Sequence, residues 1–79
     1  DMANLTPLEG RIYRHYKGGE YRLLADDVID ATNRCEPKRF VVYQNIESGT
    51  VFVHERDEFH GAVISNGIPV RRFEEVDLG

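Results

Sequence analysis

The chain has 79 residues, of which 41% are hydrophobic and 30% charged, with a net charge of −4 and one cysteine. This length allows one domain, and the composition excludes a disordered chain. The negative charge disfavours general attraction to nucleic-acid backbones, and no apolar run reaches the roughly 20 residues that span a bilayer. Because Cys35 cannot form an internal disulfide, we expect a cytoplasmic protein without membrane association.

The first nine residues are interpreted as a lead-in segment. Thr6 and Glu9 have the spacing of a helix capping box, with Pro7 at the first helical position. Gly10 follows at once, so residues 1–9 are predicted to form at most one helical turn. Residues 10–79 are predicted to form a single β domain.

A first hairpin is predicted around a pair of glycines. Residues 10–17 are rich in β-formers, and Gly18-Gly19 can adopt the positive φ angles of a tight turn. Residues 20–31 are predicted to return as a strand that Ala25-Asp26-Asp27 bulges and breaks in two. Residues 32–37, which end in proline, are predicted to form a loop.

A second hairpin contains the densest β-forming run of the chain, Phe40-Val41-Val42-Tyr43. This run makes residues 38–46 the best candidate for a central strand. Glu47-Ser48-Gly49 is predicted to turn the chain back into residues 50–54.

The register of this second hairpin stays open. One register turns Val42 with Val51 or Val53 toward the core, and the other turns Tyr43 and Phe52 toward it.

A third hairpin follows a single helical turn predicted over residues 55–59. Ser65-Asn66-Gly67 lies between the apolar runs 62–64 and 68–73, and Asn-Gly is a strong hairpin signal. Pro69 places the last strand near an edge. Five or six short strands with these turns predict an all-β sandwich or barrel.

Aromatic and basic side chains gather in the first hairpin. Tyr13 and His15 share one face of its first strand, whereas Ile12, Arg14 and Tyr16 share the other. Whichever face is buried, a tyrosine with an arginine or histidine stays outside, where it could stack on flat groups and contact carboxylate or phosphate. Adding the aromatic residues of the second hairpin gives the candidate ligand-binding residues Tyr13, Arg14, His15, Tyr16, Lys17, Tyr21, Tyr43, Phe52 and His54.

Three blocks of sequence resemble the bacterial family named domain of unknown function 1653. The blocks are Tyr13-Arg14-His15-Tyr16-Lys17-Gly18-Gly19-Glu20-Tyr21-Arg22, then Val41-Val42-Tyr43-Gln44, then Asn66-Gly67 followed by Pro69, Arg72 and Phe73-Glu74. The resemblance runs from about Gly10 to Val76. It implies a compact five-stranded barrel similar to Src-homology-3 domains, with no established activity.

The chain departs from that family at two places. It has Phe52-Val53-His54-Glu55 where the family usually carries tryptophan, valine, arginine and proline, and residues 25–40 form a longer stretch than is usual. If the family's aromatic-arginine pair forms a ligand surface, Phe52 and His54 would alter what that surface accepts.

These observations favour a non-enzymatic module that binds an extended peptide, because small barrels bind such chains in aromatic grooves or along sheet edges. One alternative is single-stranded nucleic acid, whose bases would stack on the same tyrosines. Another is a small metal-dependent enzyme using His15, His54 and the acidic turn 55–58. No metal or cofactor is expected, because the spacing matches no known ligand pattern. A homodimer through an exposed edge strand is a further hypothesis.

Overall fold

The computed structural model describes residues 8–32 and 35–76, and the N-terminal part of the predicted lead-in, residues 1–7, lies outside them. The described residues form seven strands and one single-turn helix. In chain order these are β1 (Ile12–His15), β2 (Glu20–Ile29), β3 (Arg39–Asn45), β4 (Val51–Glu55), α1 (Arg56–Phe59), β5 (Ala62–Ser65), β6 (Ile68–Arg71) and β7 (Phe73–Glu75). The mostly-β prediction and the predicted helical turn are both confirmed.

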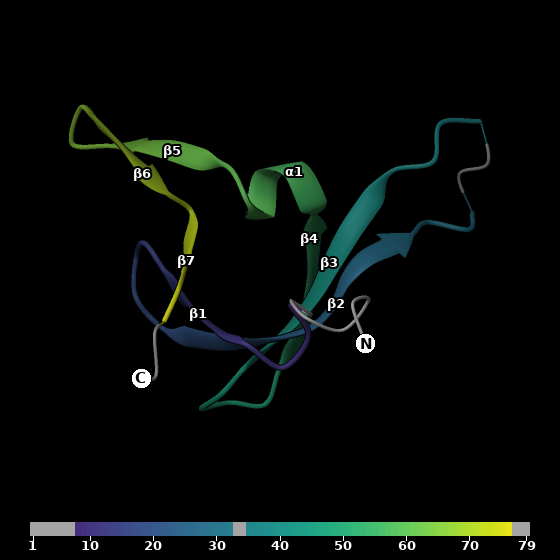
Figure 1. The fold of residues 1–79 in the computed structure, drawn as a ribbon, viewed down its shortest axis with the longest axis horizontal. Coiled ribbons are helices and arrows are strands. Elements are labelled where there is room, and N and C mark those ends of the chain that lie inside the picture. Colours follow the sequence, from purple (N-terminus) through teal and green to yellow (C-terminus); the bar gives the residue numbers. More distant parts are fainter. Residues whose placement is uncertain (1–7, 33–34, 77–79) are drawn as a thin grey trace, which may run out of the picture.

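Five of the strands form one antiparallel sheet in the order β4-β3-β2-β1-β7, and β5 and β6 form a separate two-stranded sheet. Figure 1 shows the larger sheet curling, with α1 on its concave side. The strand predicted from Phe40-Val41-Val42-Tyr43 is β3, which lies in the interior of the sheet next to its middle strand, β2.

The expected barrel is wrong, because the sheet does not close. Closure would require the two edge strands to pair, whereas β4 pairs only with β3 and β7 only with β1. The predicted last strand divides at Arg72, whose backbone N–H donates to Gly61 O (3.0 Å) and whose carbonyl accepts from Tyr16 N (3.0 Å). The part before Arg72 therefore joins β5, and the part after it joins β1.

The predicted bulge in β2 is confirmed, but the strand does not break. Its pairing with β3 shifts register between Leu23 and Ala25 and again between Ala25 and Val28, and the strand continues to Ile29. A bulge adds a residue and a local bend without ending the ladder. This bend brings Asp26 to α1, where its carboxylate accepts hydrogen bonds from Arg56 Nη2 (3.0 Å) and pairs with His60 Nε2 (2.7 Å).

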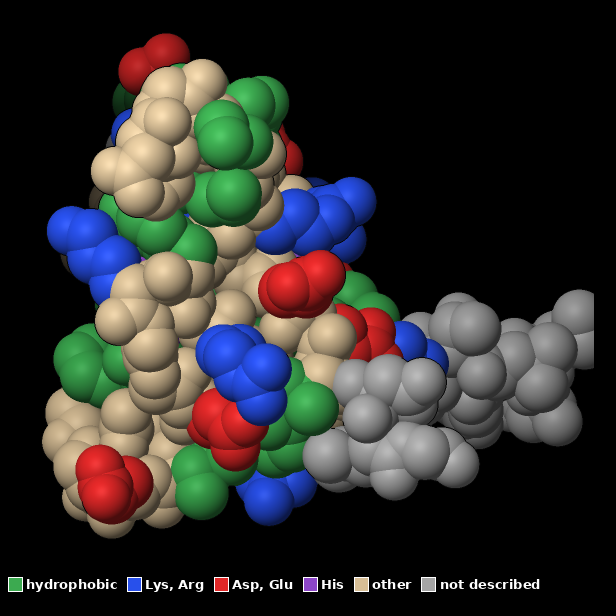
Figure 2. Space-filling model, turned by 90° about the vertical axis from the view of Figure 1, so that its left-hand side faces the viewer, with side chains coloured by type: hydrophobic (Ala, Val, Ile, Leu, Met, Phe, Trp, Pro, Cys, Tyr) green, Lys and Arg blue, Asp and Glu red, His purple; other side chains and the backbone are tan. Residues whose placement is uncertain are grey.

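The third hairpin, residues 62–71, projects from the rest of the molecule and is called the arm. Asn66 (φ 52°) and Gly67 (φ 78°) form its turn, which confirms the Asn-Gly prediction. Pro69 lies on an edge, as predicted, because this sheet has only two strands. Figure 2 shows hydrophobic side chains at the top of the molecule, over the arm, and basic side chains below them.

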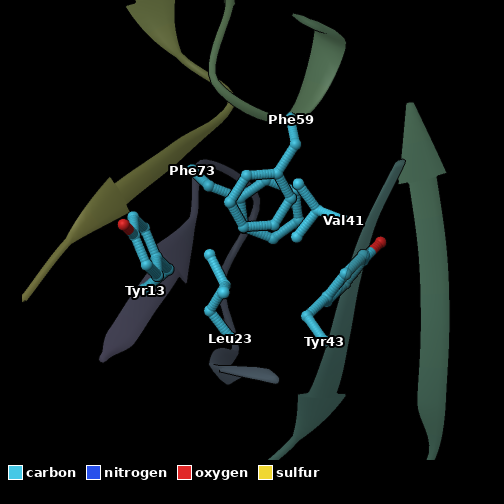
Figure 3. Close-up of a cluster of buried hydrophobic side chains, with 6 residues drawn as sticks. All are labelled: Tyr13, Leu23, Val41, Tyr43, Phe59 and Phe73. Atoms are coloured by element: carbon cyan, nitrogen blue, oxygen red, sulfur yellow. The ribbon is translucent and has the colours of Figure 1, made fainter. Parts of the chain in front are cut away.

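The core is mostly aromatic and lies between the concave side of the sheet and α1 (Figure 3). The ring of Phe59 from α1 stacks on Phe73 from β7, with centroids 4.1 Å apart. The structure also decides the open register of the second hairpin: Tyr43 and Phe52 are paired and face inward, so Val42 and Val53 face outward. The six clustered residues are Tyr13, Leu23, Val41, Tyr43, Phe59 and Phe73.

Candidate functional site

The structure divides the predicted binding residues into two groups. The first group borders a groove between the β1–β2 turn and the arm. The second belongs to the inner face of the sheet. The groove contains Arg14, His15 and Tyr16, with Lys17 in the adjoining turn, and the inner face contains Tyr13, Tyr21, Tyr43, Phe52 and His54.

The groove, called the turn–arm groove, has a volume of about 500 Å³. Arg14, His15 and Tyr16 form one side of it. The other residues that line it come from β5, β6 and β7. These are Ser65, Val70, Arg71 and Glu74.

The β1–β2 turn is wider than the predicted two-residue turn. His15 N donates to Gly19 O (3.1 Å), and Gly18 N donates to His15 O (2.8 Å), so Tyr16 and Lys17 join the glycines in the loop. Both glycines have positive φ angles, of 108° and 90°. The backbone N–H of Lys17 donates to His15 Nδ1 (3.1 Å), which orients the imidazole at the edge of the groove.

Positive charge gathers around His15. Burial lowers the pKa of His15, and the nearby Arg72, Lys17 and His54 lower it further. Arg14 is neutralised by Glu20, with its Nη2 2.8 Å from the carboxylate. Within residues 8–32 and 35–76, by contrast, Lys17, Arg71 and Arg72 have no carboxylate at ion-pair distance.

The two unpaired arginines are held by backbone carbonyls. Arg71 Nη1 donates to His60 O (3.2 Å), and Arg72 Nε donates to Glu58 O (3.1 Å). Neutral carbonyl groups leave the guanidinium charge uncompensated, so an anion in the groove would meet the positive charge of Arg71, which lines it.

The inner face is a chain of touching rings. Tyr13 and Tyr43 are buried in the core, Tyr21 is half-buried, and Phe52 is 41% exposed. Phe52 stacks on Tyr43 with centroids 5.6 Å apart and an interplanar angle of 26°. Tyr21 meets both of these rings edge-on, at 5.5 and 6.2 Å. Tyr21 and Phe52 are therefore the members of this group that present ring surface to solvent.

His54 lies at the end of this face with an unsatisfied nitrogen. Its Nε2 is 3.2 Å from Glu58 Oε1, but the angle does not make a hydrogen bond, so this buried atom has no hydrogen-bond partner. Across the described part of the chain, His, Cys, Asp and Glu side chains form no group of three that could hold a metal ion. His15 and His54 both meet Phe73 edge-on, with centroids 4.8 and 6.4 Å away.

Sequence reasoning missed the residues that the arm and β7 contribute to the groove: Ser65, Val70, Arg71 and Glu74. Asn66-Gly67 correctly predicted the hairpin that carries Ser65, Val70 and Arg71. No local sequence pattern indicated that this hairpin would separate from the larger sheet at Arg72 and lie beside the β1–β2 turn.

Comparison with known proteins gives one match. A family model described as "Protein of unknown function (DUF1653)" matches residues 11–75. No curated protein and no solved structure matches the chain. In the described residues, no helix is long and apolar enough to cross a membrane.

Proposed function

Since the chain belongs to the DUF1653 family, which is defined without a function, we propose a function from the site itself. The protein is a non-enzymatic binding module that holds an extended peptide in the turn–arm groove. One observation carries the proposal: the groove lies between two hairpins, and Arg71, which lines it, and Lys17, in the adjoining turn, have no carboxylate at ion-pair distance among the described residues.

The groove offers an extended chain both backbone and side-chain contacts. Because Arg72 N bonds to Gly61 O, the alternation of an antiparallel ladder turns the backbone N–H and C=O of Arg71 away from β5. Arg71 lines the groove, so these two groups are available to a peptide beside the end of β6, although Pro69, the other residue whose groups face outward, has no N–H to donate. Val70 and the ring of Tyr16 supply apolar contact beside them.

The charge pattern favours a peptide with acidic side chains over a nucleic acid. Carboxylates on the peptide would meet Lys17 and Arg71, while Glu74 in the same groove and the net charge of −4 would repel a long phosphate backbone. Single-stranded nucleic acid remains the second candidate because of the exposed ring of Phe52. A base stacked on such a ring gains about 1–3 kcal/mol.

The test titrates the ¹⁵N-labelled chain with pools of short acidic and short basic peptides. We expect the acidic pool to shift the amides of Tyr16, Lys17 and Arg71, and to raise the pKa of His15 by placing carboxylates beside it. Arg71→Ala should weaken these shifts. The matched control is Arg22→Ala, because the Arg22 guanidinium bonds the carbonyl of Gly10 away from the groove.

The outcomes separate the hypotheses. Absence of shifts at the groove with both pools would overturn the proposal. Shifts confined to Tyr21 and Phe52 on adding oligothymidylate would favour nucleic acid instead.

We also propose a cytoplasmic location. Cys35 is an exposed free thiol, and the reducing cytoplasm is the compartment in which such a thiol persists. Cell fractionation with an antibody against the chain tests this location.

A further inference from the structure

The strands at the sheet edges differ in how they are protected against pairing with another chain. An exposed edge is usually kept short or carries proline or lysine. Among the described strands, β7 has three residues, β5 has four, and β6 contains Pro69. The edge strand β4 is the longest of these, with five residues, Val-Phe-Val-His-Glu, and carries neither proline nor lysine; its one charged residue, Glu55, stands at its end.

The backbone of β4 has hydrogen-bonding groups that face away from the sheet. Asn45 N donates to Thr50 O (2.9 Å), which fixes the alternation of the β3–β4 ladder. Phe52 and His54 consequently bond β3, whereas the N–H and C=O groups of Val51, Val53 and Glu55 point outward. The side chains of Val51 and Val53 are 53% and 62% exposed, and no described strand pairs with this edge of β4.

We propose that β4 pairs antiparallel with β4 of a second copy of the chain, about a two-fold axis at Val53. In this register the whole strand is paired: Val53 faces Val53, Val51 faces Glu55, and Phe52 faces His54. No charged side chain lies opposite a like charge, which would destabilise the pair.

The neighbouring registers are disfavoured by charge. An axis at Glu55 would set the two Glu55 carboxylates opposite each other. An axis at Val51 would bring Glu55 toward Glu47 of the second copy. Because like charges directly opposite are destabilising, Val53 is favoured among the three axes that pass through the outward-bonding residues Val51, Val53 and Glu55.

A hollow on the outer face of the sheet also favours a two-fold axis at Val53. Val53 borders a mostly apolar hollow of about 290 Å³ together with Val28, Ile29 and Phe40, and Asp30 is the one charged residue that lines it. A two-fold axis at Val53 joins the hollows of two copies into one apolar strip, and such an isologous contact closes without further growth.

Light scattering coupled to size-exclusion chromatography tests the pairing. The chain is loaded at about 1 mM, which half-populates a complex whose dissociation constant is about 1 mM. We expect a dimer that Val53→Lys converts to a monomer, because two lysines would then face each other. The matched control Ile64→Lys, at a 70% exposed position on the arm, should leave the dimer intact. A monomeric parent chain, or a dimer lost in Ile64→Lys and kept in Val53→Lys, would overturn the proposal.

A disulfide tests the register. In a Cys35→Ser background, Val53→Cys should form an intermolecular disulfide on mild oxidation, because the two residues face each other across the axis. Val51→Cys should not, because its partner is Glu55. Equal cross-linking of the two variants would overturn the register. This pairing uses β4 and leaves the turn–arm groove free, so either proposal can fail without the other.

Discussion

The aromatic core and the arm both contain large hydrophobic side chains but bury them to opposite extents. Phe59 in the core is 0% exposed, whereas Ile64 and Ile68 in the arm are 70% and 61% exposed. The core residues are shielded from solvent because α1 packs over the concave side of a five-stranded sheet. The arm has two strands, and of its hydrophobic side chains Val63 and Val70 are half-buried while Ile64 and Ile68 are exposed.

This difference means that the core and the arm are stabilised in different ways. A two-stranded hairpin alone is marginally stable in water, so the arm depends on its base, where Arg72 N bonds Gly61 O and Arg71 bonds His60 O. The core can fold without the arm being covered. The arm consequently leaves Ile64 and Ile68 exposed, which the peptide-binding proposal requires of a surface that meets a partner.

The largest expected effect is in the core. Phe59→Ala removes a fully buried ring that stacks on Phe73, and should lower the free energy of unfolding by about 3–5 kcal/mol. Urea denaturation followed by circular dichroism measures the loss. Phe52→Ala is the matched control, because its ring is 41% exposed and its removal should cost much less. Equal losses from both variants would contradict this account of the core.

The cluster around Asp26 fastens α1 over the core. Asp26→Asn removes the charge that accepts from Arg56 and His60, and should lower the free energy of unfolding by about 1–3 kcal/mol. Asp27→Asn is the control, since Asp27 is half-exposed and only contacts Arg39 at 3.3 Å. A larger loss in Asp27→Asn would show that the cluster does not hold α1.

The carboxylate of Asp26 also makes the free energy of unfolding depend on pH. Burial by itself raises the pKa of Asp26, but hydrogen bonds from His60 and Arg56 outweigh it, so the pKa is lowered. A lowered folded-state pKa gives stability that is present above the unfolded pKa of about 3.9 and is lost as pH falls through the folded value. Urea midpoints measured from about pH 6 to pH 2 should fall less steeply in Asp26→Asn than in the parent chain.

A smaller and local effect is expected in the arm. Gly67 has a φ of 78° and open space around its Cα, so Gly67→Ala adds only the backbone strain of about 1–2 kcal/mol. Hydrogen exchange of Val63 and Val70 should become about 5–30 times faster. Exchange of Leu23 and Val41 in the core should not change. Equal acceleration in both regions would show that the arm and the core unfold together.

The smallest effect is expected at the arm surface. Ile64→Thr keeps a β-branched side chain at a 70% exposed position and should change the free energy of unfolding by less than about 0.5 kcal/mol. The urea midpoint measures this change. A loss of more than about 1 kcal/mol would mean that the arm packs against another part of the chain.

Much of the fold could be predicted because its signals are local. Gly18-Gly19 and Asn66-Gly67 marked two hairpins, and Phe40-Val41-Val42-Tyr43 marked an interior strand. The bulge at Asp26 was also predicted, although the strand continues through it. The prediction that the sheet closes into a barrel was wrong, because whether the two edge strands pair depends on segments far apart in the sequence.

The candidate site was predicted only in part. Arg14, His15 and Tyr16 do border the groove, since they lie beside a turn that the sequence specifies. Their neighbours Val70 and Arg71 come from a hairpin more than fifty residues later, and no local pattern indicated that contact.

The amino-acid sequence by itself determined where the chain turns, which segments are extended, and that tyrosine and basic residues gather in the first hairpin. Only the tertiary structure decided which side of each strand is buried, that Arg72 divides the last strand, and that the arm stands beside the β1–β2 turn. The physical reason is that turn and strand preferences arise from each residue's own backbone and side chain. Burial and pairing depend instead on which distant element covers a face, and here α1 covers the core while Ile64 and Ile68 of the arm stay exposed.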